Sequence, residues 1–157
     1  MKVRRAVPED AEAMARVHWL SSNTAYHRDD PLEHRLEASH GLFDEEGLRP
    51  FVAEQDGEVV GVLTVGEDEL YAIYVHPDRW GTGVGQALLD VAHDALAQTC
   101  EVAALTCLVG NARARRFYER NGWEPGEEVT EVHFGGELTD VVRYRKRFEP
   151  VSDTNSV

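Results

Sequence analysis

Residues Leu70 to Asp90 read LYAIYVHPDRWGTGVGQALLD, and this stretch decides the fold. A run of apolar and aromatic residues leads into three alternating glycines, Gly81, Gly83 and Gly85, and then into an amphipathic helix. Glycines let the backbone turn sharply and present successive N–H groups, and a helix that begins near Val84 adds the positive end of its dipole. The segment therefore predicts a phosphate cradle that suits a pyrophosphate.

Two common nucleotide-binding motifs do not fit this glycine segment. A dinucleotide fingerprint needs a third glycine three residues after the second, but Gln86 and Leu88 occupy the two positions where it would fall. A P-loop needs glycine followed by lysine and then serine or threonine, and the sequence contains no such triplet. Hydrolysis of a nucleoside triphosphate is therefore not expected.

The length of 157 residues predicts a single domain over residues 1–148, followed by a flexible tail at 149–157. The first ten residues, MKVRRAVPED, lack the apolar core of a secretion signal, and no run is long enough to cross a membrane. Cys100 and Cys107 are the only cysteines and form no CxxC pair. These features predict a soluble cytoplasmic protein without a disulfide framework.

Charge and histidine spacing narrow the partners and cofactors that we expect. The formal net charge of −13 argues against nonspecific binding to nucleic acid, which needs a basic surface, and favours a cationic substrate. Acidity also simply keeps small proteins soluble. The seven histidines form no HExxH or comparable pair, so no metal site is expected.

The rest of the chain alternates between strand and helix patterns. The dipeptide Asp56-Gly57 lies between two apolar runs and predicts a hairpin. Leu32 and Leu36 suggest a short second helix, and Asn121-Gly122 predicts a helix end. The expected strands are 2–6, 51–54, 59–65, 69–75, 102–109, 129–134 and 138–148, and the main helices begin near Pro8, Val84 and Ala112. Together they predict a mixed α+β fold.

The glycine segment resembles the acyl-CoA-binding motif of the GNAT superfamily of N-acyltransferases. That motif is Gln or Arg, two residues, Gly, one residue, then Gly or Ala, after a strand that often ends in a Val-x-Pro turn. Here residues 80–85, WGTGVG, fill the motif, and Val75-His76-Pro77 precedes it. Trp80 stands where the family prefers Gln or Arg. Arg79, one residue earlier, is the candidate replacement donor.

A second motif strengthens the resemblance. Asn111 is followed after seven residues by Tyr118 in a Phe-Tyr pair, with Gly122-Trp123 beyond, as in the family's Asn, Phe/Leu-Tyr and Gly-Phe pattern. The resemblance implies a central, mostly antiparallel sheet of six to seven strands with a splayed strand pair and about four helices. The cofactor-binding residues that it implies are Ile73, Tyr74, Val75, Arg79, Gly81, Thr82, Gly83, Val84, Gly85, Gln86, Asn111 and Tyr118.

The resemblance also assigns catalytic roles. Glu69 resembles the family's general base, and Tyr118 resembles its proton donor to the leaving thiolate. A solvated acidic turn would equally explain Glu69, a core aromatic would explain Tyr118, and a helix N-cap would explain Asn111. In ribosomal-protein N-terminal acetyltransferases the base falls five residues before the motif asparagine, where this chain has Thr106, so membership of that branch is less expected.

The expected function is an N-acetyltransferase that moves the acetyl group of acetyl-CoA to a primary amine by direct transfer in a ternary complex. The amine belongs to a small molecule, a peptide or a protein, and its pocket is expected from Trp19 to Phe43 and from the last hairpin. A covalent acyl-cysteine route would need a base beside Cys107, and the sequence shows none. The alternative is a noncatalytic acyl-CoA-binding or regulatory module. Dimerisation is common in the family, so a homodimer is one expectation.

Overall fold

The computed structural model describes residues 1–134 and 137–149, which divide into two compact units. The first unit comprises residues 1–67 and 71–95, and the second comprises residues 68–70 and the chain from Leu96 onward. Within the described residues, seven strands and four α-helices confirm the predicted α+β class. The single domain over 1–148 stays a prediction, and the expected tail lies outside the described residues except for Glu149.

A four-stranded sheet forms the centre of the first unit. Its strand order is β1 (Lys2–Arg5), β2 (Arg49–Gln55), β3 (Glu58–Val65) and β4 (Leu70–Val75). Strands β2 and β3 are antiparallel and turn at Asp56 and Gly57, whose φ angles are +53° and +79°. Two successive positive φ angles are what a two-residue type I′ hairpin requires. The predicted hairpin is confirmed.

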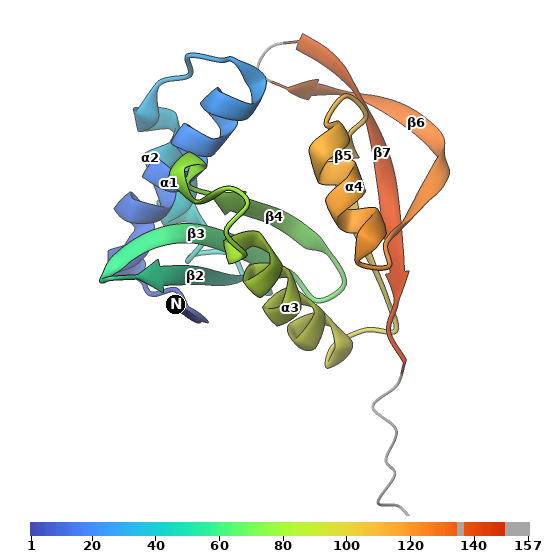
Figure 1. Cartoon of the computed structure of the whole chain (residues 1–157), viewed down its shortest axis with the longest axis horizontal. Helices are drawn as coiled ribbons and strands as arrows, with labels where there is room; N and C mark the ends of the chain where they lie inside the picture. The colour runs from blue at the N-terminus through green and yellow to red at the C-terminus, as the bar shows by residue number, and fades with distance from the viewer. Residues whose placement is uncertain (135–136, 150–157) are drawn as a thin grey trace, which may run out of the picture. The chain divides into compact units, whose positions relative to one another are not determined.

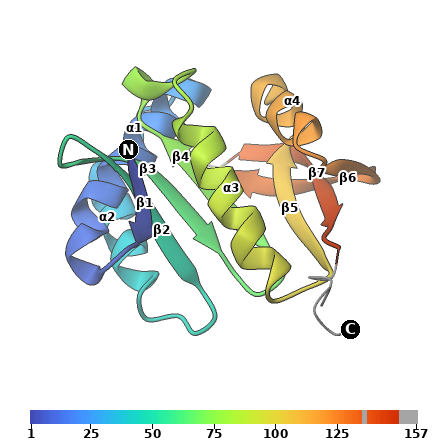
Figure 2. The same ribbon diagram turned by 60° about the horizontal axis from the view of Figure 1, so that its bottom comes forward.

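Helices cover both faces of this sheet (Figure 2). Helix α1 (Ala11–Tyr26) follows a short 3₁₀ turn at Pro8–Asp10, and its Met14 packs with Val62 of β3 in a buried apolar cluster. Helix α2 (Leu32–Gly41) pairs with α1. Helix α3 (Val84–Ala97) lies on the opposite face, where a Cβ added at Gly61 would come within 2.8 Å of Leu88 Cδ1. The apolar stripe predicted for α3 therefore packs on the sheet.

The second unit contains a three-stranded antiparallel sheet in the order β5, β7, β6 (Figure 1). Its strands are β5 (Val102–Leu108), β6 (Glu124–Phe134) and β7 (Glu137–Arg147), and helix α4 (Ala112–Arg120) connects β5 to β6. Trp123 and Tyr144 are its largest fully buried side chains. The predicted turn at Gly135-Gly136 lies outside the described residues.

Strand β6 begins at Glu124, five residues before the expected start at Val129. Pro125 and Gly126 discourage a strand assignment because proline cannot donate to the ladder and glycine packs no side chain. The structure pairs Pro125 with Tyr144 and then shifts register before Val129 pairs with Val142. This irregularity absorbs both residues, so the strand prediction was wrong at this end.

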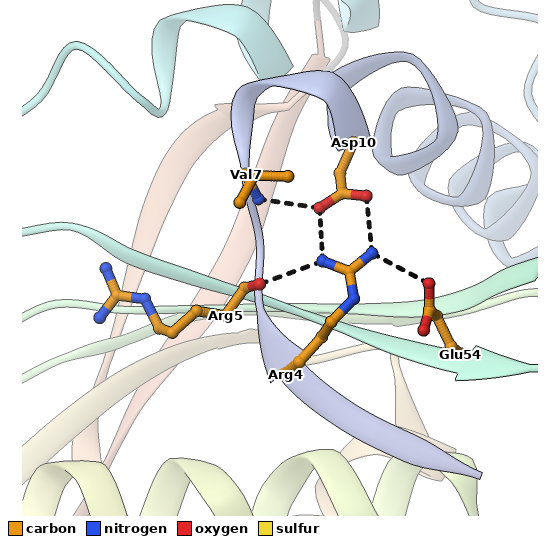
Figure 3. A network of polar contacts seen from close by, with 5 residues as sticks. All are labelled: Arg4, Arg5, Val7, Asp10 and Glu54. Atoms are coloured by element: carbon orange, nitrogen blue, oxygen red, sulfur yellow. Dashed lines mark hydrogen bonds and ion pairs between the residues drawn. The ribbon is translucent and has the colours of Figure 1, made fainter.

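A polar network fastens β1 to the beginning of α1 (Figure 3). The Arg4 guanidinium donates to Asp10 Oδ2 at 2.8 Å and to Asp10 Oδ1 at 2.9 Å, and it also donates to Glu54 Oε1 at 3.0 Å. Asp10 Oδ2 accepts a further bond from the Val7 backbone N–H at 2.8 Å. These hydrogen bonds, above all those from Arg4, hold the pKa of Asp10 below its usual range.

We expect Asp10→Asn to lower the free energy of unfolding at pH 7 by about 1–2 kcal/mol, because the charge-assisted pair with Arg4 is lost. Since the folded pKa of Asp10 is lowered, its contribution is complete above the ordinary aspartate pKa and disappears as the pH falls through the folded value. Urea unfolding of both proteins at several pH values measures this. The difference should shrink toward zero in acid.

The matched control is Glu12→Gln, which removes an exposed ion pair with Arg16 on α1 at 3.5 Å. Exposed pairs of this kind contribute little, so the control should change stability by less than about 0.5 kcal/mol. A difference between Asp10→Asn and the parent that persists unchanged in acid would contradict the ion-pair explanation.

Candidate active site

The glycine loop follows β4 and a 3₁₀ turn at Pro77–Arg79 in the first unit. Gly81 and Gly83 have φ angles of +77° and +94°, a conformation that strains any residue with a Cβ. A Cβ built at either position meets nothing within 4 Å, so space is open above the loop. Gly85 instead lies in the first turn of α3, which begins at Val84 as predicted. The expectation that all three glycines form the turn was therefore wrong for Gly85.

Side chains around the loop make contacts that stiffen it. The Trp80 indole N–H donates to the Val75 carbonyl at 2.8 Å, so the residue that departs from the family motif ties the loop back to the end of β4. Arg79 Nε donates to Gln55 Oε1 at 2.9 Å. Thr82 Oγ1 donates to the Arg79 carbonyl at 2.5 Å. Arg79 and Thr82 are thus engaged within the protein.

Further along, Gln86 Nε2 donates to Asp90 Oδ1 at 2.9 Å on the exposed side of α3. This contact runs along the helix rather than toward the loop. At the start of any helix, the first backbone N–H groups lie before the helix's own ladder of hydrogen bonds and point toward the loop that precedes it. The backbone therefore remains the better candidate for binding an anion here than the side chain of Gln86.

Strand β4 leads into this loop and also borders a cavity of about 270 Å³ in the first unit. The cavity lies among α1, α2, the turn after α2, β3 and β4. Tyr74, predicted as a cofactor-binding residue together with Ile73 and Val75, contributes its side chain to this cavity. Ala38, Ser39 and Leu42 fall in the predicted acceptor region, Trp19 to Phe43, and line it as well.

His18 and Tyr74 stack in this cavity with ring centroids 3.7 Å apart and planes at 18°. Burial, with a smaller effect of the Arg35 charge, lowers the pKa of His18 to about 3. Burial also raises the pKa of Tyr74 to about 12. Both rings are therefore uncharged at pH 7. No sequence motif gives His18 a functional role, and the fold brings its ring against that of Tyr74.

In the second unit, Asn111 begins helix α4. Its Oδ1 accepts a hydrogen bond from the Ala114 backbone N–H at 3.1 Å, which is the N-cap arrangement. The capping explanation of Asn111 is thereby confirmed. Capping fixes where α4 starts and so fixes the position of Tyr118, two turns further along the same helix.

Tyr118 is half-buried within an aromatic cluster of the second unit. Its ring centroid lies 5.4 Å from that of Phe117 and 6.3 Å from those of Trp123 and Tyr144. This packing agrees with the alternative of a core aromatic, but partial exposure leaves part of the side chain accessible. The cluster holds the ring in one orientation, which a proton donor also needs.

Polar contacts of the buried Tyr144 fix α4 to the sheet. The Tyr144 hydroxyl donates to Glu119 Oε2 at 2.7 Å and accepts from Arg115 Nε at 2.9 Å. Burial raises the pKa of Tyr144. Both partners lie on α4, on either side of Tyr118 in the sequence, so this neutral phenol bridges the helix to β7.

Glu69 lies immediately before β4 in the chain and belongs to the second unit, where it forms an isolated parallel bridge with Ala104 of β5. Its carboxylate accepts two hydrogen bonds from Arg143, at 3.2 Å to Oε1 and 3.4 Å to Oε2. Arg143 Nη1 also donates to Thr106 Oγ1 at 3.1 Å. Glu69 is thus held in a specific ion pair rather than in a freely solvated turn.

Cys107 is buried on β5. Burial raises the pKa of its thiol to about 11, so the reactive thiolate is scarce at pH 7. This agrees with the expectation that no acyl-cysteine forms.

Residues 1–134 and 137–149 lack both a candidate metal site and a membrane-spanning helix. No group of three or more His, Cys, Asp or Glu side chains is placed to hold a metal ion there. No helix in this part of the chain is both long and apolar enough to cross a membrane.

Residues 11–123 match the family model described as the acetyltransferase (GNAT) family. The chain belongs to this family. The match includes the glycine loop, Asn111 and Tyr118, so both predicted motifs lie within it. The resemblance of both motifs to the GNAT superfamily is thereby confirmed.

Relatives of this GNAT chain include the uncharacterized N-acetyltransferase YuaI of Bacillus subtilis, which is 32% identical over 102 residues. That alignment covers 55% of this chain and 59% of YuaI. The chain spans less than two thirds of the length of the curated relatives that it matches.

Solved structures confirm the GNAT fold. A GCN5-related N-acetyltransferase from Rhodopseudomonas palustris aligns with a TM-score of 0.74 at 26% identity, covering 94% of this chain and 95% of the other. YncA, a putative acetyltransferase from Salmonella typhimurium solved with acetyl-CoA, also aligns at 0.74, with 18% identity and coverage of 100% and 99%. At 18% identity, the similarity to YncA supports the fold alone.

Proposed function

We propose that the protein is an N-acetyltransferase that moves the acetyl group of acetyl-CoA to a primary amine by direct transfer in a ternary complex. The observation that carries this proposal is the family match, which includes the glycine loop and the helix bearing Asn111 and Tyr118. The conformations of Gly81 and Gly83 support it independently, because they keep the loop backbone accessible.

The loop fits the pyrophosphate of acetyl-CoA. The positive φ angles of Gly81 and Gly83, with open space where their side chains would stand, leave room for a phosphate against the backbone. The N–H groups of the loop and of the first turn of α3 would hold it, with help from the helix dipole. The strand β4 backbone at Ile73 would pair with the extended arm as an added strand does. When bound, acetyl-CoA supplies an activated acyl group and a thiol leaving group.

Glu69 is the residue that we assign to receive the amine proton. An alkyl ammonium with a pKa of about 10.4 requires roughly 4.6 kcal/mol to reach its neutral form at pH 7. A carboxylate offers about four lone-pair sites, and the two long bonds from Arg143 occupy two of them. Glu69 therefore retains acceptor capacity for an amine or for an intervening water.

Tyr118 is the residue that we assign to protonate the leaving thiolate. A thiol pKa of about 8.5 makes that protonation favourable by only about 2 kcal/mol at pH 7, so a weak acid is sufficient. A phenol donates a hydrogen bond while staying neutral at this pH. The ring contacts with Trp123 and Tyr144 would keep its hydroxyl in place.

An acceptor screen tests the proposed function. The protein is incubated with acetyl-CoA and a panel of amines, thiol release is followed, and the acetylated product is identified by mass. We expect at least one amine to gain an acetyl group. Tight acetyl-CoA binding with no amine acetylated would instead favour a noncatalytic acyl-CoA-binding or regulatory module.

Gly83→Ala should weaken acetyl-CoA binding about tenfold, because a Cβ at φ +94° costs roughly 1–2 kcal/mol and shifts the loop. Titration calorimetry with acetyl-CoA measures this. Gly57→Ala is the matched control, since Gly57 also has a positive φ and open space at its Cβ but lies in the β2–β3 turn. Both variants should lose stability, and equal loss of affinity in both would contradict the cradle.

A further inference from the structure

The cavity beside α1 and α2 has a size and a lining that select a particular kind of ligand. Its volume of about 270 Å³ is just below the usual range of ligand pockets, roughly 300–1,000 Å³. A cavity of this size accommodates one ring or one short alkyl chain. It is too small for a peptide segment or a branched sugar. Every lining residue belongs to the first unit.

The interior of this cavity is uncharged and mostly apolar, with the buried hydroxyl residues Ser39 and Thr64 also in its lining. Met14 and Val62 belong to the buried apolar cluster behind it, and Leu42 packs against the same cluster. His18 and Tyr74 present stacked aromatic rings, and neither carries a charge at pH 7. Such a surface gains free energy by removing an apolar ligand from water, and aromatic faces also attract a second ring.

A single carboxylate, Glu45, supplies the formal charge among the residues that line the cavity. It is exposed in the turn after α2, so it acts at the opening rather than in the interior. Arg35 is close enough to affect the pKa of His18 but is not among the lining residues. Glu45 and the net charge of −13 both favour a cation over an anion.

The cavity also lies on the strand that the proposed chemistry uses. Ala72 and Tyr74 of β4 line it, and β4 continues through Val75 toward the glycine loop. One strand would thus present side chains to the acceptor and backbone groups to acetyl-CoA. This arrangement connects the apolar cavity with the proposed acetyl transfer.

We propose that this cavity seats the apolar body of the acceptor, and that the preferred acceptor is a small primary amine bearing an aromatic ring or a short alkyl chain, drawn to the opening by Glu45. This assignment rests on the proposed acetyl transfer for its catalytic consequence. Binding of the amine alone does not depend on that transfer.

The test compares phenethylamine with putrescine, an amine whose chain ends in a second cation. Binding to the protein without acetyl-CoA is followed by saturation-transfer NMR, and kcat/KM is measured with acetyl-CoA present. We expect phenethylamine to bind and to be acetylated with a kcat/KM at least about tenfold above that of putrescine, because the ring is buried and the second ammonium is not accommodated.

Two pairs of variants locate the binding. Ala38→Phe adds a ring to an exposed lining residue of α2 and should abolish the NMR contact, whereas Ala25→Phe, at an exposed α1 residue outside the lining, should not. Glu45→Gln should weaken phenethylamine binding about threefold or more, while its exposed neighbour Glu46→Gln, outside the lining, should leave binding within twofold.

Failure of this inference is distinguishable from failure of the proposed function. Preferential acetylation of putrescine, or unchanged phenethylamine binding in Ala38→Phe, would overturn the cavity assignment while leaving the acetyltransferase in place. A different result would separate the two claims. If phenethylamine binds, Ala38→Phe abolishes that binding and no amine is acetylated, the cavity assignment would be supported and the proposed acetyl transfer would be contradicted.

Discussion

Tyr118→Phe is expected to lower kcat about 100-fold while the affinity for acetyl-CoA stays within a few-fold. Removing a positioned proton donor typically costs two to four orders of magnitude, and the lower end applies because a thiolate leaves readily. The variant keeps the ring, so the contacts with Phe117, Trp123 and Tyr144 should persist. Single-turnover rates and calorimetric acetyl-CoA titration separate the chemical step from binding.

Tyr26→Phe is the matched control for this experiment. Tyr26 is also half-buried, but it ends α1 and is not among the residues that line the cavity. Its hydroxyl lies near enough to Tyr74 to affect the pKa of that ring, so its loss is expected to act on amine affinity. We expect kcat to stay within about twofold, because no proton transfer is assigned to Tyr26. Unchanged turnover in Tyr118→Phe would remove Tyr118 from the role of acid and leave it as a packing residue.

The elements that local sequence determines were predictable. The Asp56-Gly57 hairpin depends on two positive φ angles, and this dipeptide tolerates them. The turn of the glycine loop is local in the same sense, because it depends on the positive φ angles of Gly81 and Gly83. The start of β6 was not predictable, since the pairing of Pro125 with Tyr144 depends on a distant strand.

The contacts of the candidate site join residues that are far apart in the sequence, so motif spacing could not predict them. Arg143 is half-exposed and no sequence motif links it to Glu69, yet its guanidinium holds the Glu69 carboxylate. This contact follows from the register that pairs Thr106 with Arg143 and from the bridge between Glu69 and Ala104. The aromatic stack of His18 on Tyr74 likewise joins a helix to a strand.

Thr106 has a role in the structure that its place in the sequence did not indicate. Its position lacks the base of one family branch, and its hydroxyl instead accepts a hydrogen bond from the Arg143 guanidinium that also holds Glu69. Thr106, which lies on β5, therefore helps to hold the Arg143 side chain that binds Glu69, the candidate base. The base assignment thus depends on Glu69 alone, and it can be tested there.

Glu69→Gln is expected to lower kcat/KM about 100-fold at pH 7, with a loss that grows as the pH falls below the pKa of the amine. In that range the amine arrives as a cation, and the wild-type carboxylate can take its proton whereas the amide cannot. Above the pKa of the amine, the neutral amine reacts without that help, so the two proteins should converge. Rates measured across the pH range with one amine and saturating acetyl-CoA test this.

Glu69→Gln removes the carboxylate charge while keeping part of the contact with Arg143. The variant can therefore separate a role as base from a purely structural role. The glutamine side chain keeps one oxygen that accepts from Arg143, so the hydrogen bond that spans the β4 start and β7 is reduced rather than abolished. Glu67→Gln, at an exposed neighbour, is the control and should show no pH-dependent loss. A loss in Glu69→Gln that is uniform at all pH values would mean that Glu69 only positions Arg143 and the adjoining strands.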